Sequence, residues 1–262
     1  MRLIISLIVV AIGVGMMSAD KAVDEYKVIK VIGDIVYKRS GKSMSTGDVF
    51  KSDASLVFKT NNSRAAVISN LKGRFILAPP SKEQKTNLVP AVNSISSRSG
   101  AIVNALDIKN HFQGEYLIID EVAVPVSPQT FPQDKTHFFF LSYEYNGEKI
   151  MKKLQNRGEK LVINKKSVFS IDGKPIKPFD TDVTLYYRDA TSKENTKLST
   201  FKMIVPDEED LKQEVEVILD EYKDKSESEQ FDQVKGYLTE FYGKPFDESL
   251  RNWMESFDTS EK

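Results

Sequence analysis

Short apolar runs separated by turn residues occupy the first part of the chain. The runs are rich in Val, Ile, Phe and Tyr, and Gly, Asn and Asp stand between them. This pattern is typical of short antiparallel strands in a small barrel or sandwich. We therefore predict a first β-domain over residues 20–80, with strands at 26–32, 35–37, 56–58, 65–68 and 75–77.

A second series of strand patterns covers residues 101–205. Asn146-Gly147 separates two of the longest runs and is a strong hairpin signal, because both turn positions need positive φ. Pro125 and Pro128 mark an edge strand or a strand end. The number and spacing of the runs predict an immunoglobulin-like β-sandwich. The expected strands are 115–119, 122–126, 137–145, 148–154, 161–164, 167–171, 183–188 and 198–205.

The hydrophobic period changes from strand to helix in residues 206–262. Asp207 is placed to cap a first helix, and Ser226 with Glu229 forms a capping-box pattern for a second. Gly243 stands where the second helix should end, and a third is expected from about Asp247. Each helix has an apolar stripe, so the three must pack on each other or on the β body. The stripes are Leu211, Val215, Ile218, Leu219 and Tyr222; Phe231, Val234, Tyr237, Leu238 and Phe241; and Leu250, Trp253, Met254 and Phe257.

Residues 81–100 are mostly polar; Pro79-Pro80-Ser81-Lys82 opens the stretch, and a Ser, Asn and Gly cluster over residues 93–100 closes it. Such composition is typical of exposed loops. We therefore predict a linker here, between the first β-domain and the sandwich.

The N-terminus has the three parts of a secretory signal. Arg2 supplies the positive start, residues 3–17 are apolar apart from Ser6, and Ser18-Ala19 supplies small residues. The apolar run is shorter than the roughly 20 residues that span a bilayer. We predict a signal peptide over residues 1–19 and no membrane span after its cleavage, with a retained N-terminal anchor as the alternative.

Cysteine is absent from the sequence. A lipid-anchored bacterial lipoprotein and a disulfide framework are therefore both excluded. A large exported chain without cysteine suggests a bacterial envelope, either the periplasm or the cell surface.

Charge is divided unevenly along the chain. Residues 20–205 carry 29 Lys/Arg against 20 Asp/Glu, a net +9, whereas residues 206–262 carry 7 against 18, a net −11. The division coincides with the change from strand to helix period. We predict that the acidic helices dock on a basic surface, either of the β body or of a partner.

The first β-domain resembles the FecR-type periplasmic domain. The resemblance rests on four segments within about residues 26–80: Val31-Ile32-Gly33-Asp34-Ile35-Val36, Thr46-Gly47-Asp48-Val49-Phe50, Leu56-Val57-Phe58-Lys59-Thr60 with Ser63-Arg64-Ala65, and Lys72-Gly73-Arg74-Phe75. It implies a role in sensing or binding in the bacterial periplasm, which some members combine with regulation of a sigma factor through a transmembrane helix. Only Met1 and Arg2 precede the apolar run at 3–17, so we expect no cytoplasmic segment of the kind that such a regulator carries.

Few residues suggest catalysis or metal binding. His111 and His137 are the only histidines, so the usual zinc sites cannot be assembled, and a Gly-x-Ser-x-Gly elbow is absent. Gly41-Lys42-Ser43 lacks the earlier glycine of a phosphate loop and indicates a hairpin. We therefore predict no catalytic, cofactor-binding or metal-binding residues and no cofactor.

Two carboxylate pairs keep an alternative open. Asp120-Glu121 and Asp180-Thr181-Asp182 both precede or join strands, and a glycosidase needs two carboxylates in a cleft. Acidic residues between strands are also ordinary turn residues. The aromatic run 137–145 has two possible explanations, a platform for stacking a ligand or a strand buried on both faces. Successive residues of a strand point to opposite faces, and both faces are apolar here, which favours the buried strand.

These patterns together predict a mainly β protein with three helices at its C-terminus. The expected function is a non-catalytic binding, adaptor or sensor module of the envelope with a protein partner and no nucleic acid. The alternatives are a carboxylate-dependent hydrolase of glycan or peptidoglycan and a FecR-type sigma-factor regulator. The identity of any small-molecule ligand does not follow from the sequence.

Overall fold

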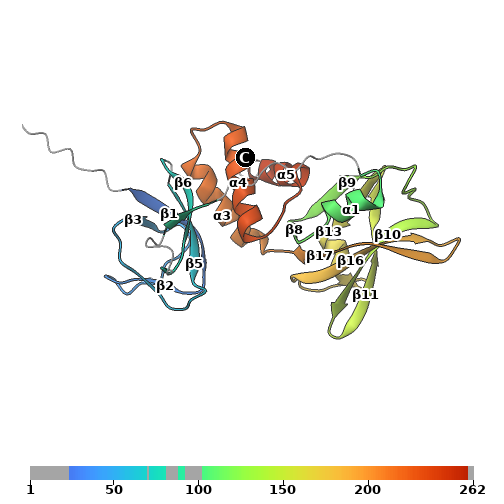
Figure 1. Ribbon diagram of the computed structural model, residues 1–262, viewed down its shortest axis with the longest axis horizontal. Helices are drawn as coiled ribbons and strands as arrows, with labels where there is room; N and C mark the ends of the chain where they lie inside the picture. The colour runs from blue at the N-terminus through green and yellow to red at the C-terminus, as the bar shows by residue number, and fades with distance from the viewer. Residues whose placement is uncertain (1–23, 70, 81–87, 92–101, 259–262) are drawn as a thin grey trace, which may run out of the picture.

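The computed structural model describes residues 24–69, 71–80, 88–91 and 102–258. The predicted signal peptide, 1–19, and most of the predicted linker, 81–100, lie outside these residues. Figure 1 shows three parts, in which the C-terminal helices lie between the first β part and the second. The fold is mainly β with a C-terminal segment of three helices, as predicted.

The first β part consists of a five-stranded sheet and a two-stranded sheet that pack against each other. The larger sheet has the order β3-β1-β5-β6-β7, and the smaller is β2-β4. No closed barrel forms among the described residues, so of the two predicted forms the sandwich is correct. The strands are β1 (Glu25–Ile32), β2 (Ile35–Tyr37), β3 (Val49–Lys51), β4 (Leu56–Phe58), β5 (Arg64–Ser69), β6 (Gly73–Leu77) and β7 (Leu88–Pro90).

Strand β7 lies within the range predicted as a linker. It pairs antiparallel with β6, with Phe75 opposite Pro90 and Leu77 opposite Leu88. The first sheet therefore extends past residue 80. Three residues between polar clusters give too short an apolar run for the sequence pattern to reveal a strand.

The second β part is a two-layer sandwich. One sheet has the order β11-β10-β16-β17-β8, and the facing sheet has the order β12-β13-β9. The elements are α1 (Ala105–His111), β8 (Glu115–Leu117), β9 (Glu121–Pro125), β10 (His137–Tyr145), β11 (Glu148–Lys153), β12 (Gln155–Arg157), β13 (Lys160–Asn164), α2 (Lys165–Val168), β14 (Ser170–Ile171), β15 (Lys174–Pro175), β16 (Thr181–Asp189) and β17 (Glu194–Ile204).

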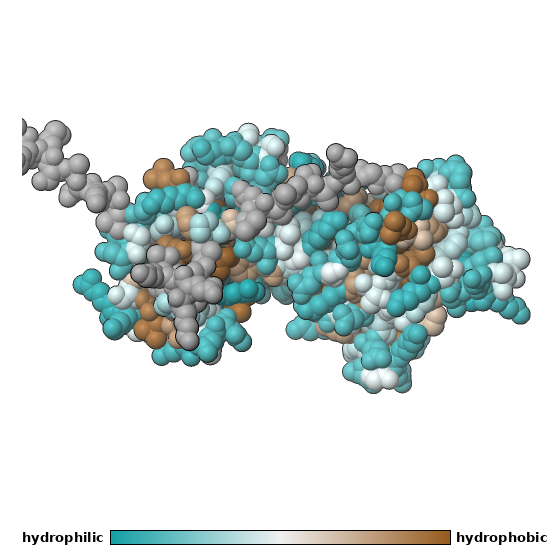
Figure 2. Space-filling model, in the orientation of Figure 1, coloured by the Kyte–Doolittle hydropathy of each residue, from teal (hydrophilic) through white to brown (hydrophobic). Residues whose placement is uncertain are grey.

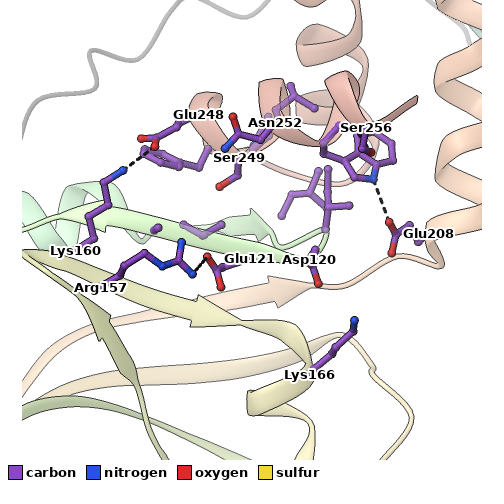
Figure 3. A pocket seen from close by; sticks show the side chains of 18 residues that line it. Asp120, Glu121, Arg157, Lys160, Lys166, Glu208, Glu248, Ser249, Asn252 and Ser256 are labelled. Atoms are coloured by element: carbon purple, nitrogen blue, oxygen red, sulfur yellow. Dashed lines mark hydrogen bonds and ion pairs between the residues drawn. The ribbon is translucent and has the colours of Figure 1, made fainter. Parts of the chain in front are cut away.

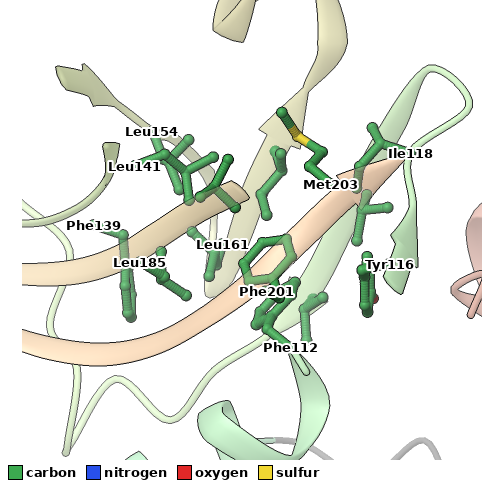
Figure 4. Packing of buried hydrophobic residues seen from close by; sticks show 14 of the residues in the cluster. Phe112, Tyr116, Ile118, Phe139, Leu141, Leu154, Leu161, Leu185, Phe201 and Met203 are labelled. Atoms are coloured by element: carbon green, nitrogen blue, oxygen red, sulfur yellow. The ribbon is translucent and has the colours of Figure 1, made fainter. Parts of the chain in front are cut away.

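An aromatic and aliphatic core fills the space between the two sheets. Figure 4 shows Phe112, from the end of α1, beside Phe201 of β17, and their rings stack with centroids 5.3 Å apart. Leu161 of β13 faces this group from the smaller sheet. The core also explains the aromatic run: Phe139 faces inward, whereas Phe140 is buried on the outer face and stacks on Tyr186.

Two local predictions in the second part need correction. Residues 167–171 were expected to form one strand, but Asn164 caps the short helix α2, and only β14 follows as a strand. Helix α1 was not predicted, although Asn104 and Asp107 form a complete capping box at its start. The predicted hairpin is correct, because Asn146 and Gly147 have φ values of 52° and 81° between β10 and β11.

The three C-terminal helices begin at the predicted caps. The side chain of Asp207 accepts hydrogen bonds at the start of α3 (Glu208–Glu221), and Ser226 with Glu229 forms a capping box at the start of α4 (Glu227–Phe241). The third helix, α5 (Asp247–Asp258), follows after Gly243. Figure 2 shows a hydrophilic outer surface where α3 turns into α4, so the apolar stripes face inward.

The acidic helices dock on the chain's own β body. Ile29 and Ile68 of the first sheet and Leu117 of β8, in the sandwich, share one apolar cluster with the stripes of α3, α4 and α5. Basic side chains of the β parts pair with acidic side chains of the helices at the edge of this cluster. These ion pairs are Lys27–Asp220, Lys30–Glu214, Arg74–Glu240 and Lys160–Glu248. The predicted docking is therefore intramolecular.

The segment after α4 also joins the sandwich through its backbone. Lys244 forms a parallel bridge with Tyr116 of β8, and its N–H donates to the Glu115 carbonyl at 2.9 Å. Gly243 has a φ of 105°, and a Cβ atom there would stand 2.6 Å from the Glu115 oxygen. Only glycine fits this close approach. In the described part of the chain, helices with the length and apolar character of a membrane span are absent.

Candidate functional site

A groove of about 580 Å³ opens between α5 and the β9 side of the sandwich. Figure 3 shows α5 above β9, with side chains from both elements turned into the space between them. The volume lies within the range of ligand sites in proteins, which often occur where two structural units meet. The lining residues are Leu117, Ile119, Asp120, Glu121, Val122, Ala123, Arg157, Lys160, Lys166, Glu208, Pro245, Phe246, Glu248, Ser249, Leu250, Asn252, Trp253 and Ser256.

Buried apolar residues underlie the groove, and its accessible surface is mainly polar. Leu117, Leu250 and Trp253 belong to the cluster that joins the helices to the β parts, and Phe246 belongs to the sandwich core. The groove therefore lies along the seam between the two cores. Its shape depends on the docking of α5.

Polar contacts bridge the groove at both ends. Lys160 Nζ of β13 lies 2.7 Å from Glu248 Oε1 of α5, and Trp253 Nε1 donates to Glu208 Oε1 at 3.2 Å. Arg157 of β12 pairs with Glu121 of β9 at 2.8 Å. These contacts fix the position of α5 over the sheet and leave charges of both signs at the rim.

The structure separates the two predicted carboxylate pairs. Asp120 and Glu121 line the groove together with Glu208 and Glu248. Asp180 and Asp182 are not among the lining residues, and Asp180 Oδ1 accepts the Val205 N–H at 2.9 Å. From the sequence alone, only carboxylates that are close in the chain could be paired. The two helix carboxylates were missed because their proximity depends on docking.

The two histidines serve different local roles. His111 Nε2 lies 2.8 Å from the Tyr116 hydroxyl, and burial lowers the pKa of His111 to about 4, with the Lys244 charge lowering it further. Burial also raises the pKa of Tyr116 well above its usual range. His111 is thus a neutral core residue at the base of the sandwich.

His137 lies at the surface between two aspartates. Its Nδ1 is 3.1 Å from Asp134 Oδ2, and its Nε2 is 3.5 Å from Asp189 Oδ1. Hydrogen bonds from Thr136 and His137 hold the pKa of Asp134 below its usual range. In the described residues, groups of three or more acidic, histidine or cysteine side chains suited to a metal are absent.

Two other sequence features have structural explanations. Gly41 has a φ of 71° in the turn after β2, Lys42 pairs with Asp48, and Ser43 hydrogen-bonds Asp34, as expected for a hairpin. The Phe138 ring is covered by Lys153, whose Nζ lies 4.0 Å from its centroid. One face of this ring is therefore already occupied.

No family model matches the chain, and no curated protein matches it either.

Proposed function

We propose that this chain is an exported, non-catalytic protein of the bacterial envelope that binds a partner protein in the groove between α5 and β9. The observation that carries the proposal is the groove itself. Residues distant in sequence, from 117 to 256, form its surface, and charged groups of both signs lie over a buried apolar floor. That composition suits recognition of a macromolecule.

The state of the groove carboxylates favours binding over catalysis. Glu121 and Glu248 are each held by a cation, and Glu208 accepts the Trp253 N–H. A general acid, by contrast, is a carboxyl group that keeps its proton near neutral pH in an apolar site. Groups already fixed in ion pairs are better suited to orienting a partner.

The sequence supports the proposed envelope location. Residues 1–19 have the pattern of an export signal, and residues 26–80 resemble a periplasmic sensing or binding domain. The same resemblance keeps a sigma-factor regulator as an alternative. Intact-mass measurement of the native protein tests both points, because a mature chain that begins near Asp20 supports export and removes the membrane-anchored regulator.

A hydrolase is the second candidate, and one observation favours it. Among the described residues, Asp120 is a groove carboxylate without an ion-pair partner, and Glu121 is its neighbour. Purified protein should then release products from peptidoglycan or envelope glycan, and Asp120→Asn should abolish the release. Turnover with this dependence would replace the binding proposal.

Site-directed photo-crosslinking in the native host tests the binding proposal. A benzoylphenylalanine at Asn252, which is exposed and lines the groove, should capture one envelope protein on illumination. The matched position is Lys197 of β17, which is also exposed but lies outside the groove. Equal capture from both positions, or none from Asn252, would contradict the proposal.

A further inference from the structure

The large sheet of the sandwich has a second face, which points away from the core. Phe139 and Leu141 of β10 belong to the sandwich core, so the alternate residues Phe138 and Phe140 point to the opposite side. Among the described residues, the three apolar clusters of the fold contain neither Phe138 nor Phe140. We call this side of β11, β10, β16 and β17 the outer face. Figure 1 shows these strands on the side of the molecule away from the first β part.

Strand register shows which side chains share the outer face. Three neighbouring rows cross the strands: Phe138, Arg188 and Asn195; Lys153, Phe140, Tyr186 and Lys197; and Met151, Ser142, Thr184 and Thr200. Lys153 Nζ lies 4.0 Å from the centroid of the Phe138 ring, as expected for side chains on one face. Thr184 Oγ1 lies 3.4 Å from Thr200 Oγ1 in the same way.

An aromatic pair lies at the centre of these rows. The Phe140 and Tyr186 rings stack almost in parallel, with their centroids 4.9 Å apart. Phe140 is only 4% exposed, so it supports the face and is not itself a contact for a ligand. Tyr186 is partly exposed, and its stack on Phe140 fixes the position of its ring. Met151, in the next row, is 58% exposed. The accessible apolar surface is therefore limited, and it lies beside polar groups.

The three cations of these rows are not neutralised by carboxylates. Lys153 lies over the Phe138 ring, and Arg188 Nη1 donates to Asn195 Oδ1 at 2.9 Å, so both have uncharged partners. Lys197 is exposed. Within the described part of the chain, none of the three takes part in an ion pair.

Carboxylates are also absent from the three described rows. The next acidic side chains along the outer face are Glu144 and Asp182. Each of them stands opposite a lysine, Lys149 for Glu144 and Lys202 for Asp182. The centre of the outer face is therefore positive and complementary to an anion.

The mixture of groups indicates what kind of anion fits. Lysine and arginine bind carboxylates, and Thr184 and Thr200 offer hydroxyl groups for further hydrogen bonds. The partly exposed ring of Tyr186 can pack against the C–H face of a sugar ring. A chain of acidic sugars carries carboxylates, hydroxyls and such C–H faces together. A membrane surface fits less well, because it needs apolar side chains that protrude into it, and Phe140 is buried.

We propose that the outer face of the sandwich binds an acidic polysaccharide. Its carboxylates contact Lys153, Arg188 and Lys197, and one sugar ring packs on Tyr186. This site is separate from the groove between α5 and β9, and its ligand goes beyond the proposed protein partner.

Oligomers of alginate and of polygalacturonate, which are linear chains of uronic acids, provide the probes. Their Kd for the purified full chain is measured by fluorescence anisotropy. At least one should bind about tenfold or more tightly than polyglutamate, which carries similar charge without sugar rings, and dextran, a neutral glycan, should bind weakly. Failure of both uronate chains to bind, or equal binding of polyglutamate, would overturn the inference. Tighter binding of phosphatidylglycerol vesicles would assign the face to a membrane and overturn it as well.

Variants of exposed lysines test the location. Lys153→Gln combined with Lys197→Gln should weaken binding of the uronate chain by about tenfold or more, because two charged contacts are lost. Lys174→Gln is the matched control, since Lys174 is an exposed lysine of β15, in another sheet, and should leave the Kd unchanged. Equal effects of the double variant and the control would show that the glycan does not bind at the outer face.

Methionine methyl NMR on the unaltered chain gives a readout that does not depend on how a variant folds. Met151 is exposed on the outer face, whereas Met203 is 0% exposed in the sandwich core and is a control within the same molecule. The uronate chain should shift the Met151 methyl signal, which Met151→Leu identifies, and leave the Met203 signal in place. Binding that leaves the Met151 signal unchanged would place the glycan elsewhere and overturn the inference.

Discussion

Lys30 of β1 reaches the buried carboxylate of Glu214 on α3, with Nζ 2.7 Å from Oε1, across 184 positions of sequence. The hydroxyls of Tyr237 and Tyr242 donate to the other carboxylate oxygen at 2.6 and 2.5 Å. A β-bulge in β1 next to Val28 accompanies this arrangement. This cluster joins the first sheet to two helices at one buried point.

Loss of the Lys30 charge should be costly because Glu214 stays buried. Lys30→Met should reduce the free energy of unfolding by about 3 kcal/mol, while Glu214→Gln should cost less, since Lys30 can turn to water. In a double-mutant cycle measured by urea unfolding, the double variant should lose clearly less unfolding free energy than the two single variants lose together.

The matched control is Lys27–Asp220, which joins the same two elements at 2.6 Å but has a half-exposed aspartate. Its coupling should be below about 1 kcal/mol. Equal couplings for the two pairs would show that burial of Glu214 is not what makes its pair strong.

Gly243→Ala should loosen α5 from the sandwich. A Cβ atom there meets the Glu115 backbone, and the φ of 105° adds strain, so the expected cost is more than about 2 kcal/mol. Gly158→Ala is the control, because its φ is 61° but nothing lies within 4 Å of the added atom. Thermal melts compare the two variants. Similar melting temperatures would mean that the contact with Glu115 is easily relieved.

Gly147→Val should destabilise the β10–β11 hairpin by about 1 to 2 kcal/mol, because a β-branched residue resists positive φ. The space around Gly147 is open, so the backbone alone is tested. Gly147→Asn should cost less, since asparagine tolerates this conformation. Chemical unfolding gives the comparison, and an effect of valine no larger than that of asparagine would argue against the turn.

Acid should destabilise the chain through His111. Its pKa is about 4 when folded and near 6.5 when unfolded, so the unfolded chain takes up the proton first. Stability from this group is complete above pH 6.5 and falls by about 3 kcal/mol as the pH drops through 4. His111→Gln should flatten this slope in urea unfolding measured across the range, whereas His137→Gln, at the surface, should keep it. A slope unchanged by His111→Gln would assign the effect to other groups.

Local signals predicted the secondary structure where it depends on neighbouring residues. The Asn146-Gly147 turn, the caps at Asp207 and Ser226 and the edge character of the strand with Pro125 each follow from one short pattern. The prediction of a strand over 167–171 was wrong because Asn164 caps a short helix, which takes up the first residues of that apolar run. Helix α1 was missed although its capping box was readable.

The groove was not predictable in the same way. Its surfaces come from β9, β12, β13 and the last helix, and no local pattern states that Ala123 and Asn252 share a cavity. The charge division indicated only that the helices would dock. The pairing of particular carboxylates with particular cations depends on how the apolar stripes of the helices pack against two separate sheets.

The late position of α3 and α4 in the chain has a kinetic consequence. Among the described residues, Ile29 and Ile68 of the first sheet pack in one cluster with the helices that begin at Glu208. Contacts between such distant parts form slowly, because a long loop must close before burial compensates for the lost entropy. Until the helices dock, the first sheet exposes an apolar face. Such a face can aggregate or bind a chaperone of the holdase type. Refolding of the full chain should therefore be slow and concentration-sensitive, with a yield that rises when a holdase is present.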